Sequence, residues 1–96
     1  MNEERQIVTP SSVPDWPRGV RLRYDEAREK WVIVSPEKVS VPNETAVEIL
    51  KLVDGEHTAT GIAEILATQY EASKDLILRD VVTVLQTLSD KGIIAC

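Results

Sequence analysis

The chain has 96 residues, of which 43% are hydrophobic and 28% charged, and its net charge is -5. This composition is typical of one small globular domain, a size that leaves little room for a deep substrate cavity. No apolar run approaches the roughly 18 residues that a membrane-spanning helix needs, and the first ten residues lack the basic and apolar regions of a secretory signal. We therefore expect a cytoplasmic protein that does not bind membranes.

The first 17 residues are polar and rich in proline and serine. Residues 9–14 read Thr-Pro-Ser-Ser-Val-Pro, and Asp15-Trp16-Pro17 follows them. Such a stretch does not build a regular helix or strand. We therefore expect residues 1–17 to be a flexible tail or linker and residues 18–96 to be the folded domain.

Three short strands are expected next. Residues 20–24 alternate between apolar and polar side chains, which is the period of a strand with one buried face. Residues 31–34 are apolar on both faces, as in a central strand. Residues 38–41 alternate again and lie between two prolines, which suits a short edge strand. The pattern predicts an antiparallel sheet in which these strands follow one another in chain order.

From Pro42 onward the apolar residues recur with a helical period, which predicts three helices. Each helix has a plausible N-cap side chain. The candidate caps are Asn43 for the first helix, Thr58 or Thr60 for the second and Ser73 for the third. Gly55 and Gly92 suit the ends of the first and third helices. The predicted fold class is α+β and winged-helix-like, with a three-stranded antiparallel sheet followed by three helices.

The third predicted helix carries more apolar surface than one core contact needs. At about 100° per residue, its core stripe is expected to contain Ile77, Val81, Val84 and Leu88. Leu78 and Val82 lie at roughly 100° from the centre of that stripe, with Leu85 between. This apolar shoulder is either covered by a sheet edge or by the first helix, or it lines a binding groove.

No motif indicates catalysis or metal binding. His57 is the only histidine and lies in the loop 54–58, and Cys96 is the only cysteine. The chain has no nucleophile motif, no glycine-rich phosphate loop and no HExxH pattern. We therefore expect no enzymatic activity, no metal site and no cofactor. The single cysteine also suits a reducing cytoplasm.

A winged-helix regulator that binds DNA is the main alternative. DNA binding needs a basic surface, whereas the third helix balances its bases with as many acids. The charged residues in question are Lys74, Arg79 and Lys91 against Asp75, Asp80 and Asp90. We therefore do not expect nucleic-acid binding.

Taken together, four segments resemble the PqqD family of pyrroloquinoline quinone biosynthesis. They read RGVRLRYD at 18–25, WVIVSPEKV at 31–39 and DGEHT at 54–58, and the fourth runs from Asp80-Val81-Val82 to Lys91-Gly92. The match covers nearly everything from residue 18 to residue 94. The resemblance implies a winged-helix-like RiPP recognition element, a domain that holds the leader of a ribosomally made peptide while other enzymes modify it.

The resemblance also implies partners. In the family the ligand is the quinone precursor peptide (PqqA-like), and a radical SAM enzyme (PqqE-like) links a glutamate and a tyrosine within it. This chain would bind the peptide and present it to that enzyme. The iron–sulfur clusters would belong to the enzyme.

The resemblance further implies a peptide site between the third strand and the third helix. On this sequence the strand side would be Lys38, Val39, Ser40 and Val41, and the helix side would be Leu78, Val82 and Leu85. The segment before Arg18 is longer than the family pattern, and some relatives are fused to the oxidase of the final step (PqqC-like). Fusion to that oxidase, or association with it, stays open, and so does recognition of a different modified peptide.

Overall fold

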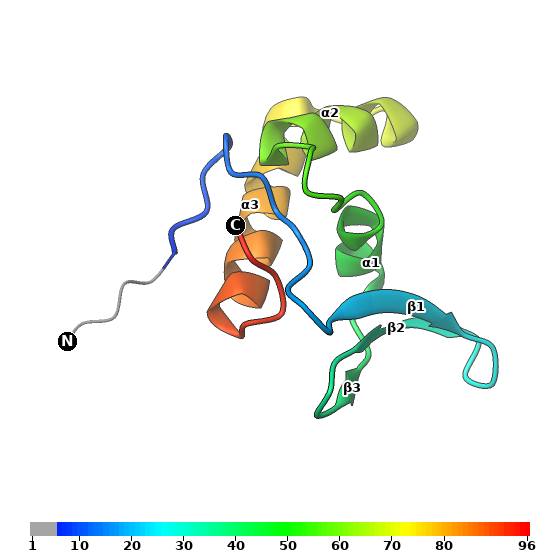
Figure 1. The fold of residues 1–96 in the computed structure, drawn as a ribbon. Helices are drawn as coiled ribbons and strands as arrows, with labels where there is room; N and C mark the ends of the chain where they lie inside the picture. The colour runs from blue at the N-terminus through cyan, green and yellow to red at the C-terminus, as the bar shows by residue number, and fades with distance from the viewer. Residues whose placement is uncertain (1–5) are drawn as a thin grey trace.

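The computed structural model describes residues 6–96, and within them strands precede helices (Figure 1). The strands are β1 (Arg21–Asp25), β2 (Lys30–Val34) and β3 (Val39–Ser40), and the helices are α1 (Glu44–Leu50), α2 (Ala59–Tyr70) and α3 (Lys74–Asp90). The sheet is antiparallel with the order β1-β2-β3. This confirms the predicted α+β class, a three-stranded antiparallel sheet followed by three helices. No helix in the described part of the chain is long and apolar enough to cross a membrane.

The two faces of the sheet differ in chemistry. Leu22 pairs with Ile33 and Ile33 with Ser40, so these side chains share one face. Ile33 is 3% exposed and belongs to the core cluster, against which Leu22 packs. The alternate residues lie on the other face, where Arg23 and Val39 are exposed but Val32, opposite Arg23, is 2% exposed. The first face therefore meets the helices, and the second is largely exposed except at Val32.

Side chains cap the first two helices, as the sequence predicts. Asn43 Oδ1 accepts a hydrogen bond from the N–H of Ala46 at 2.8 Å, and Thr58 Oγ1 accepts one from the N–H of Gly61 at 2.9 Å. Ser73 occupies the N-cap position of α3 without a side-chain bond. Each of the two caps satisfies an N–H that the helix leaves unpaired, and such a cap stabilises by about 1 kcal/mol.

The core is built mainly from the helices. Ile62 of α2 and Val81 and Leu85 of α3 are 0% exposed, and Ile49 and Leu50 of α1 are 1% exposed. Together with Ile33 from the sheet they form one cluster of buried side chains. Burying a side chain of this size stabilises by about 1.5–3 kcal/mol. The fold therefore depends on the three helices meeting over one face of the sheet.

Residues 6–17, which we call the N-terminal strap, lie against the helices (Figure 1). Val8 is 5% exposed and belongs to the core cluster, and Pro14 is fully buried. Trp16 is half-buried and packs against the same cluster. Asp15 pairs with Ala95 near the end of the chain through two backbone hydrogen bonds of 2.8 and 3.0 Å. The strap is thus part of the folded unit.

Backbone hydrogen bonds hold the strap to α2. The N–H of Ala59 donates to the carbonyl of Ser12 at 2.9 Å, and the N–H of Thr60 donates to the carbonyl of Pro10 at 3.0 Å. The first N–H groups of a helix have no partner within the helix. The carbonyl groups of the strap accept hydrogen bonds from these N–H groups. The carbonyl of a proline accepts such a bond as well as that of any other residue.

The prediction that residues 1–17 form a flexible tail or linker is therefore wrong for the strap, and its first five residues lie outside the described part of the chain. The composition indicated correctly that no regular element forms there. It did not reveal that an irregular segment can bury Val8 and satisfy a helix end. The folded unit includes the strap as well as residues 18–96.

We predict that Val8→Asp lowers the free energy of unfolding by about 2–3 kcal/mol, because it places a carboxylate among core side chains. The matched control is Ile7→Asp, since Ile7 is 62% exposed, and its stability should change by no more than about 0.5 kcal/mol. Urea denaturation followed by circular dichroism measures both. Equal stability of the two variants would contradict the place of the strap in the core.

Candidate functional site

Strand β3 has a free edge. It pairs with β2, with Val34 opposite Val39, and no strand in the described residues lies on its other side. The N–H of Ser35 donates to the carbonyl of Lys38 at 3.0 Å, so residue 38 is bonded toward β2. Because the direction of bonding alternates along an antiparallel pair, the N–H and C=O of Val39 point to the free edge. Such an edge is able to pair with an extended peptide.

The residues predicted on the strand side of the site fall on both faces of the sheet. Lys38 and Ser40 line a hollow of about 300 Å³, together with residues 91–93 that follow α3. Val39 and Val41 are 51% and 56% exposed and alternate with Ser40, so they lie on the solvent face. The strand therefore directs Ser40 toward the end of α3 and the two valines away from it.

The residues predicted on the helix side line neither this hollow nor the larger one described below. Leu85 is 0% exposed in the core cluster, so its assignment to the peptide site is wrong. The buried stripe of α3 is formed by Val81, Leu85 and Leu88. This stripe is rotated about the helix axis toward Leu85, compared with the stripe that the sequence predicted. Leu78 and Val82 are half-buried and pack against the core. Their contact with a peptide stays a prediction.

Gln86 shows which shoulder of α3 the strap covers. Its Oε1 accepts a hydrogen bond from the N–H of Val8 at 2.9 Å, and its Nε2 donates to the carbonyl of Gln6 at 2.9 Å. Val82 lies four residues before Gln86 and therefore on the same side of the helix. The shoulder of Leu78 and Val82, which the sequence predicted to line the groove, therefore faces the strap.

The opposite shoulder of α3 carries Ile77, Asp80 and Val84, and Lys91 follows on the same side directly after the helix. Ile77, Val84 and Lys91 follow one another at a spacing of two helical turns. Ile77 and Asp80 line the larger hollow described next, and Lys91 lines the smaller one. The sequence placed Ile77 and Val84 in the core stripe and so missed this shoulder. Their half-burial in the structure is the signal that separates them from Val81.

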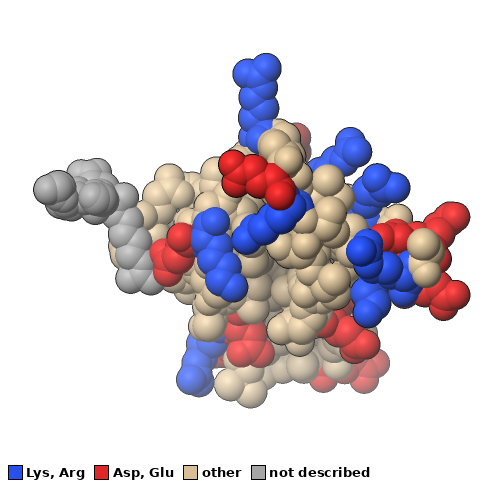
Figure 2. All heavy atoms as spheres, turned by 90° about the horizontal axis from the view of Figure 1, so that it is seen from below, with Lys and Arg blue, Asp and Glu red and all other residues tan. Residues whose placement is uncertain are grey.

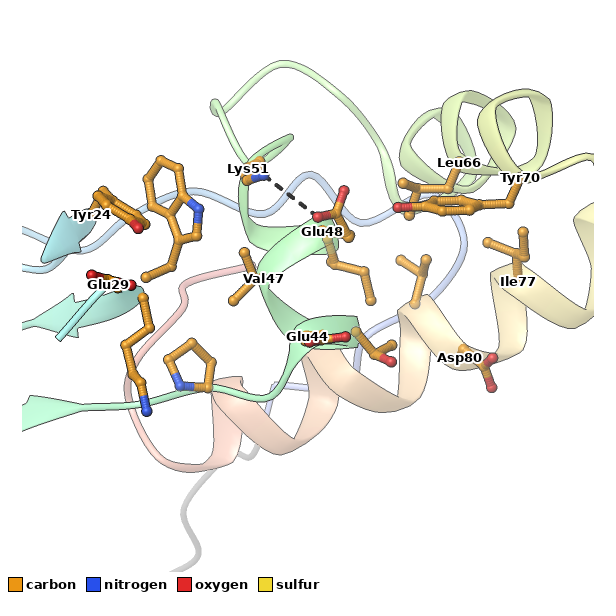
Figure 3. Close-up of a pocket in the computed structure, with 16 residues that line it drawn as sticks. Tyr24, Glu29, Glu44, Val47, Glu48, Lys51, Leu66, Tyr70, Ile77 and Asp80 are labelled. Carbon is orange, nitrogen blue, oxygen red and sulfur yellow. Dashed lines mark hydrogen bonds and ion pairs between the residues drawn. The ribbon is translucent and has the colours of Figure 1, made fainter. Parts of the chain in front are cut away.

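A larger hollow of about 670 Å³, which we call the trough, follows one side of α1 (Figure 3). Residues of α1 at helical spacing run along it, with the β1–β2 hairpin at one end and α2 and α3 at the other (Figure 3). The α1 side is lined by Glu44, Val47, Glu48 and, directly after the helix, Lys51; the hairpin supplies Tyr24 and Trp31, and the other end is Leu66, Tyr70, Ile77 and Asp80. The trough therefore combines aromatic and acidic side chains from five elements, β1, β2, α1, α2 and α3.

Aromatic and charged contacts order the trough. The rings of Tyr24 and Trp31 meet edge to face with centroids 5.5 Å apart. Lys51 Nζ lies 5.1 Å from the centroid of the Trp31 ring and 3.5 Å from Glu48 Oε2. The hydroxyl of Tyr70 points toward Glu48 (Figure 3), and its hydrogen bond to that carboxylate raises the pKa of Tyr70. No pattern in the sequence indicates this cluster, because its members come from distant elements.

His57 is part of a turn. Its Nδ1 lies 2.8 Å from Asp54 Oδ2, and Asp54 Oδ1 accepts the backbone N–H groups of His57 and Glu56 at 2.9 Å each. The backbone bond from His57, followed by that from Glu56, lowers the pKa of Asp54. Within residues 6–96 no group of three His, Cys, Asp or Glu side chains is placed to hold a metal ion.

The fold is that of a RiPP recognition element. The chain is 42% identical to the PqqD truncation of Methylobacterium extorquens PqqCD, whose solution NMR structure represents a functional and stand-alone element of this class. The similarity covers 93% of this chain and 95% of that chain, with a TM-score of 0.80.

The particular family follows from the sequence comparisons. The family model of coenzyme PQQ synthesis protein D (PqqD) matches residues 30–94. The PqqA binding protein of Bradyrhizobium diazoefficiens is 47% identical over 88% of this chain and 82% of its own length. The bifunctional coenzyme PQQ synthesis protein C/D of Methylorubrum extorquens is 44% identical over 95% of this chain and 24% of its own length. The chain belongs to the PqqD family, as the sequence segments predicted.

Proposed function

We propose that this chain binds the precursor peptide of pyrroloquinoline quinone biosynthesis, a PqqA-like peptide, and presents it to the radical SAM enzyme of that pathway, a PqqE-like protein. The observation that carries the proposal is the free edge of β3 in a member of the PqqD family. Relatives such as the Bradyrhizobium diazoefficiens protein are named PqqA binding protein. The peptide adds to the sheet as a fourth strand beside β3.

Strand addition explains how a domain with shallow hollows holds a peptide. The backbone of Val39 supplies hydrogen bonds at the free edge, and these bonds do not depend on the peptide sequence. Alternate peptide side chains then turn toward α3. The proposed site includes residues 38–41, as the sequence predicted. Its helix side is the shoulder of Ile77, Val84 and Lys91, in place of the predicted shoulder of Leu78 and Val82.

In this role the chain is an adaptor and not an enzyme. The iron–sulfur clusters and the chemistry belong to the radical SAM partner, so the chain needs no cofactor of its own. A similar domain occurs in the Methylorubrum extorquens C/D protein, so association with a PqqC-like oxidase is part of the proposal. A cytoplasmic location, expected from the sequence, is also part of it.

We predict that Val39→Pro weakens binding of the PqqA-like peptide about three- to tenfold, because the proline lacks the N–H that the added strand would use. That N–H points away from β2, so the sheet should persist. Val39→Thr keeps the amide and the β-branched shape and should bind normally. Isothermal titration calorimetry measures both affinities. Normal binding by a folded Val39→Pro variant would rule out strand addition at this residue.

A second pair of variants decides between the two shoulders of α3. Val84→Ser removes apolar surface from the shoulder that faces the hollows, and we predict about tenfold weaker peptide binding. Val82→Ser makes the same change on the shoulder that faces the strap, and the affinity should stay the same. Both side chains are half-buried, so their costs in stability should be similar. If Val82→Ser alone weakens binding, the site lies where the sequence first placed it.

The salt dependence of binding separates this proposal from DNA recognition. Hydrogen bonds of an added strand and apolar contacts respond little to salt, so we predict that peptide affinity falls less than about tenfold between about 50 and 200 mM salt. A winged helix that neutralises several phosphates would lose about three to five decades over the same range. Fluorescence anisotropy with labelled peptide and with duplex DNA measures both. Tight, steeply salt-dependent binding of the duplex would favour the regulator.

A further inference from the structure

We propose that the two ends of the β3 site select a peptide of asymmetric charge, with basic and apolar residues before the added strand and acidic residues after it. This inference rests on the proposed function and deepens it, since it names the direction of the bound peptide and the charge pattern that the site accepts. It is carried by the side chains that line the smaller hollow and the trough.

The end of the site at the β2–β3 turn is basic. The smaller hollow is lined by Lys38 and Lys91 against one acid, Glu37, so two positive charges face one negative charge there. Both lysines are exposed, and neither makes an ion pair within residues 6–96. Figure 2, which views the side on which β3 lies in Figure 1, shows Lys and Arg side chains projecting from this face, with Asp and Glu side chains among them. This end therefore suits a carboxylate of the ligand.

The other end of the site is acidic. The trough is lined by four carboxylates and two lysines, a difference of two negative charges; the residues are Glu29, Glu44, Glu48 and Asp80 against Lys30 and Lys51. Lys51 is already engaged by Glu48 at 3.5 Å. Glu44 and Asp80 line the trough together with Pro42, which follows β3, and make no ion pair in the described part of the chain. This end therefore suits a lysine or an arginine of the ligand.

The direction of the peptide follows from the direction of β3. The strand runs from Lys38 toward Pro42, that is, from the basic end to the acidic end. Both strand pairs of the sheet are antiparallel, and antiparallel pairing is slightly the more stable kind. A peptide antiparallel to β3 passes the acidic end with its N-terminal part and the basic end afterwards. Charge complementarity then places its basic residues before the strand and its acidic residues after it.

The trough adds an apolar requirement. Tyr24 and Tyr70 are 45% and 56% exposed, and the Trp31 ring lies in the same hollow. Aromatic faces accept apolar side chains and also cations. The segment before the added strand should therefore carry an apolar or aromatic residue next to a basic one.

Paramagnetic labels on the precursor peptide test the direction. A nitroxide at the N-terminus of the PqqA-like peptide should broaden the amide signals of Thr45 and Asp80 in the full chain, and a nitroxide placed after the strand segment should broaden those of Lys38 and Gly92. The reverse pattern, or equal broadening at both ends by either label, would overturn the inference and leave the proposed function standing. If neither label broadens Val39 or Ser40, the proposed binding site itself fails.

Charge reversal tests the selection. Lys91→Glu and Lys38→Glu should each weaken binding of the PqqA-like peptide about three- to tenfold at low salt, and a peptide whose acids after the strand are changed to lysines should recover the loss. The control Arg79→Glu makes the same charge change on an exposed residue of α3 away from both hollows and should bind normally. Circular dichroism confirms that each variant is folded. Equal losses for Arg79→Glu, or no recovery by the altered peptide, would show that no charge pattern is being selected.

Discussion

The hydrogen bonds between the strap and the helices determine which side of α3 is available to a ligand. Pro10 and Ser12 satisfy the first N–H groups of α2, and Gln86 binds the backbone at Gln6 and Val8. The strap is thereby fixed against the shoulder of α3 that includes Val82. The other shoulder is left facing β3 and α1, so an irregular segment sets the geometry of the site.

Local patterns were sufficient for the elements of the fold. The alternation in residues 20–24, the caps Asn43 and Thr58, and the edge position of β3 each depend on a few neighbouring residues, and the structure has all of them. Which shoulder of α3 is free to bind a ligand could not be predicted from such local patterns. Helical periodicity locates the axis of an apolar stripe, but it does not say which flank another segment covers. Leu85 was misplaced for this reason, since its burial depends on packing contacts with distant parts of the chain.

The trough could not be predicted from the sequence for a similar reason. Tyr24 and Trp31 form a pair near the turn of the β1–β2 hairpin. They share the face of the sheet that carries Ile33, but they lie beyond the part of that face that covers the core. Tyr70 ends α2, and Glu48 lies on α1. Nothing in the spacing of these residues indicates that they meet, because tertiary packing alone brings the hairpin and the end of α2 to opposite ends of α1.

An unpaired strand edge exposes a protein to unwanted pairing with other chains, and β3 limits this risk by its length. It has two residues, Val39 and Ser40, and lies between Pro36 and Pro42, neither of which has an N–H to donate. So short an edge offers few backbone hydrogen bonds, each with a net value of only about 1 kcal/mol. A peptide bound there must therefore gain much of its affinity, and all of its specificity, from side chains. That requirement is why the hollows at the two ends of β3, with their unlike charges, matter more to recognition than the strand itself.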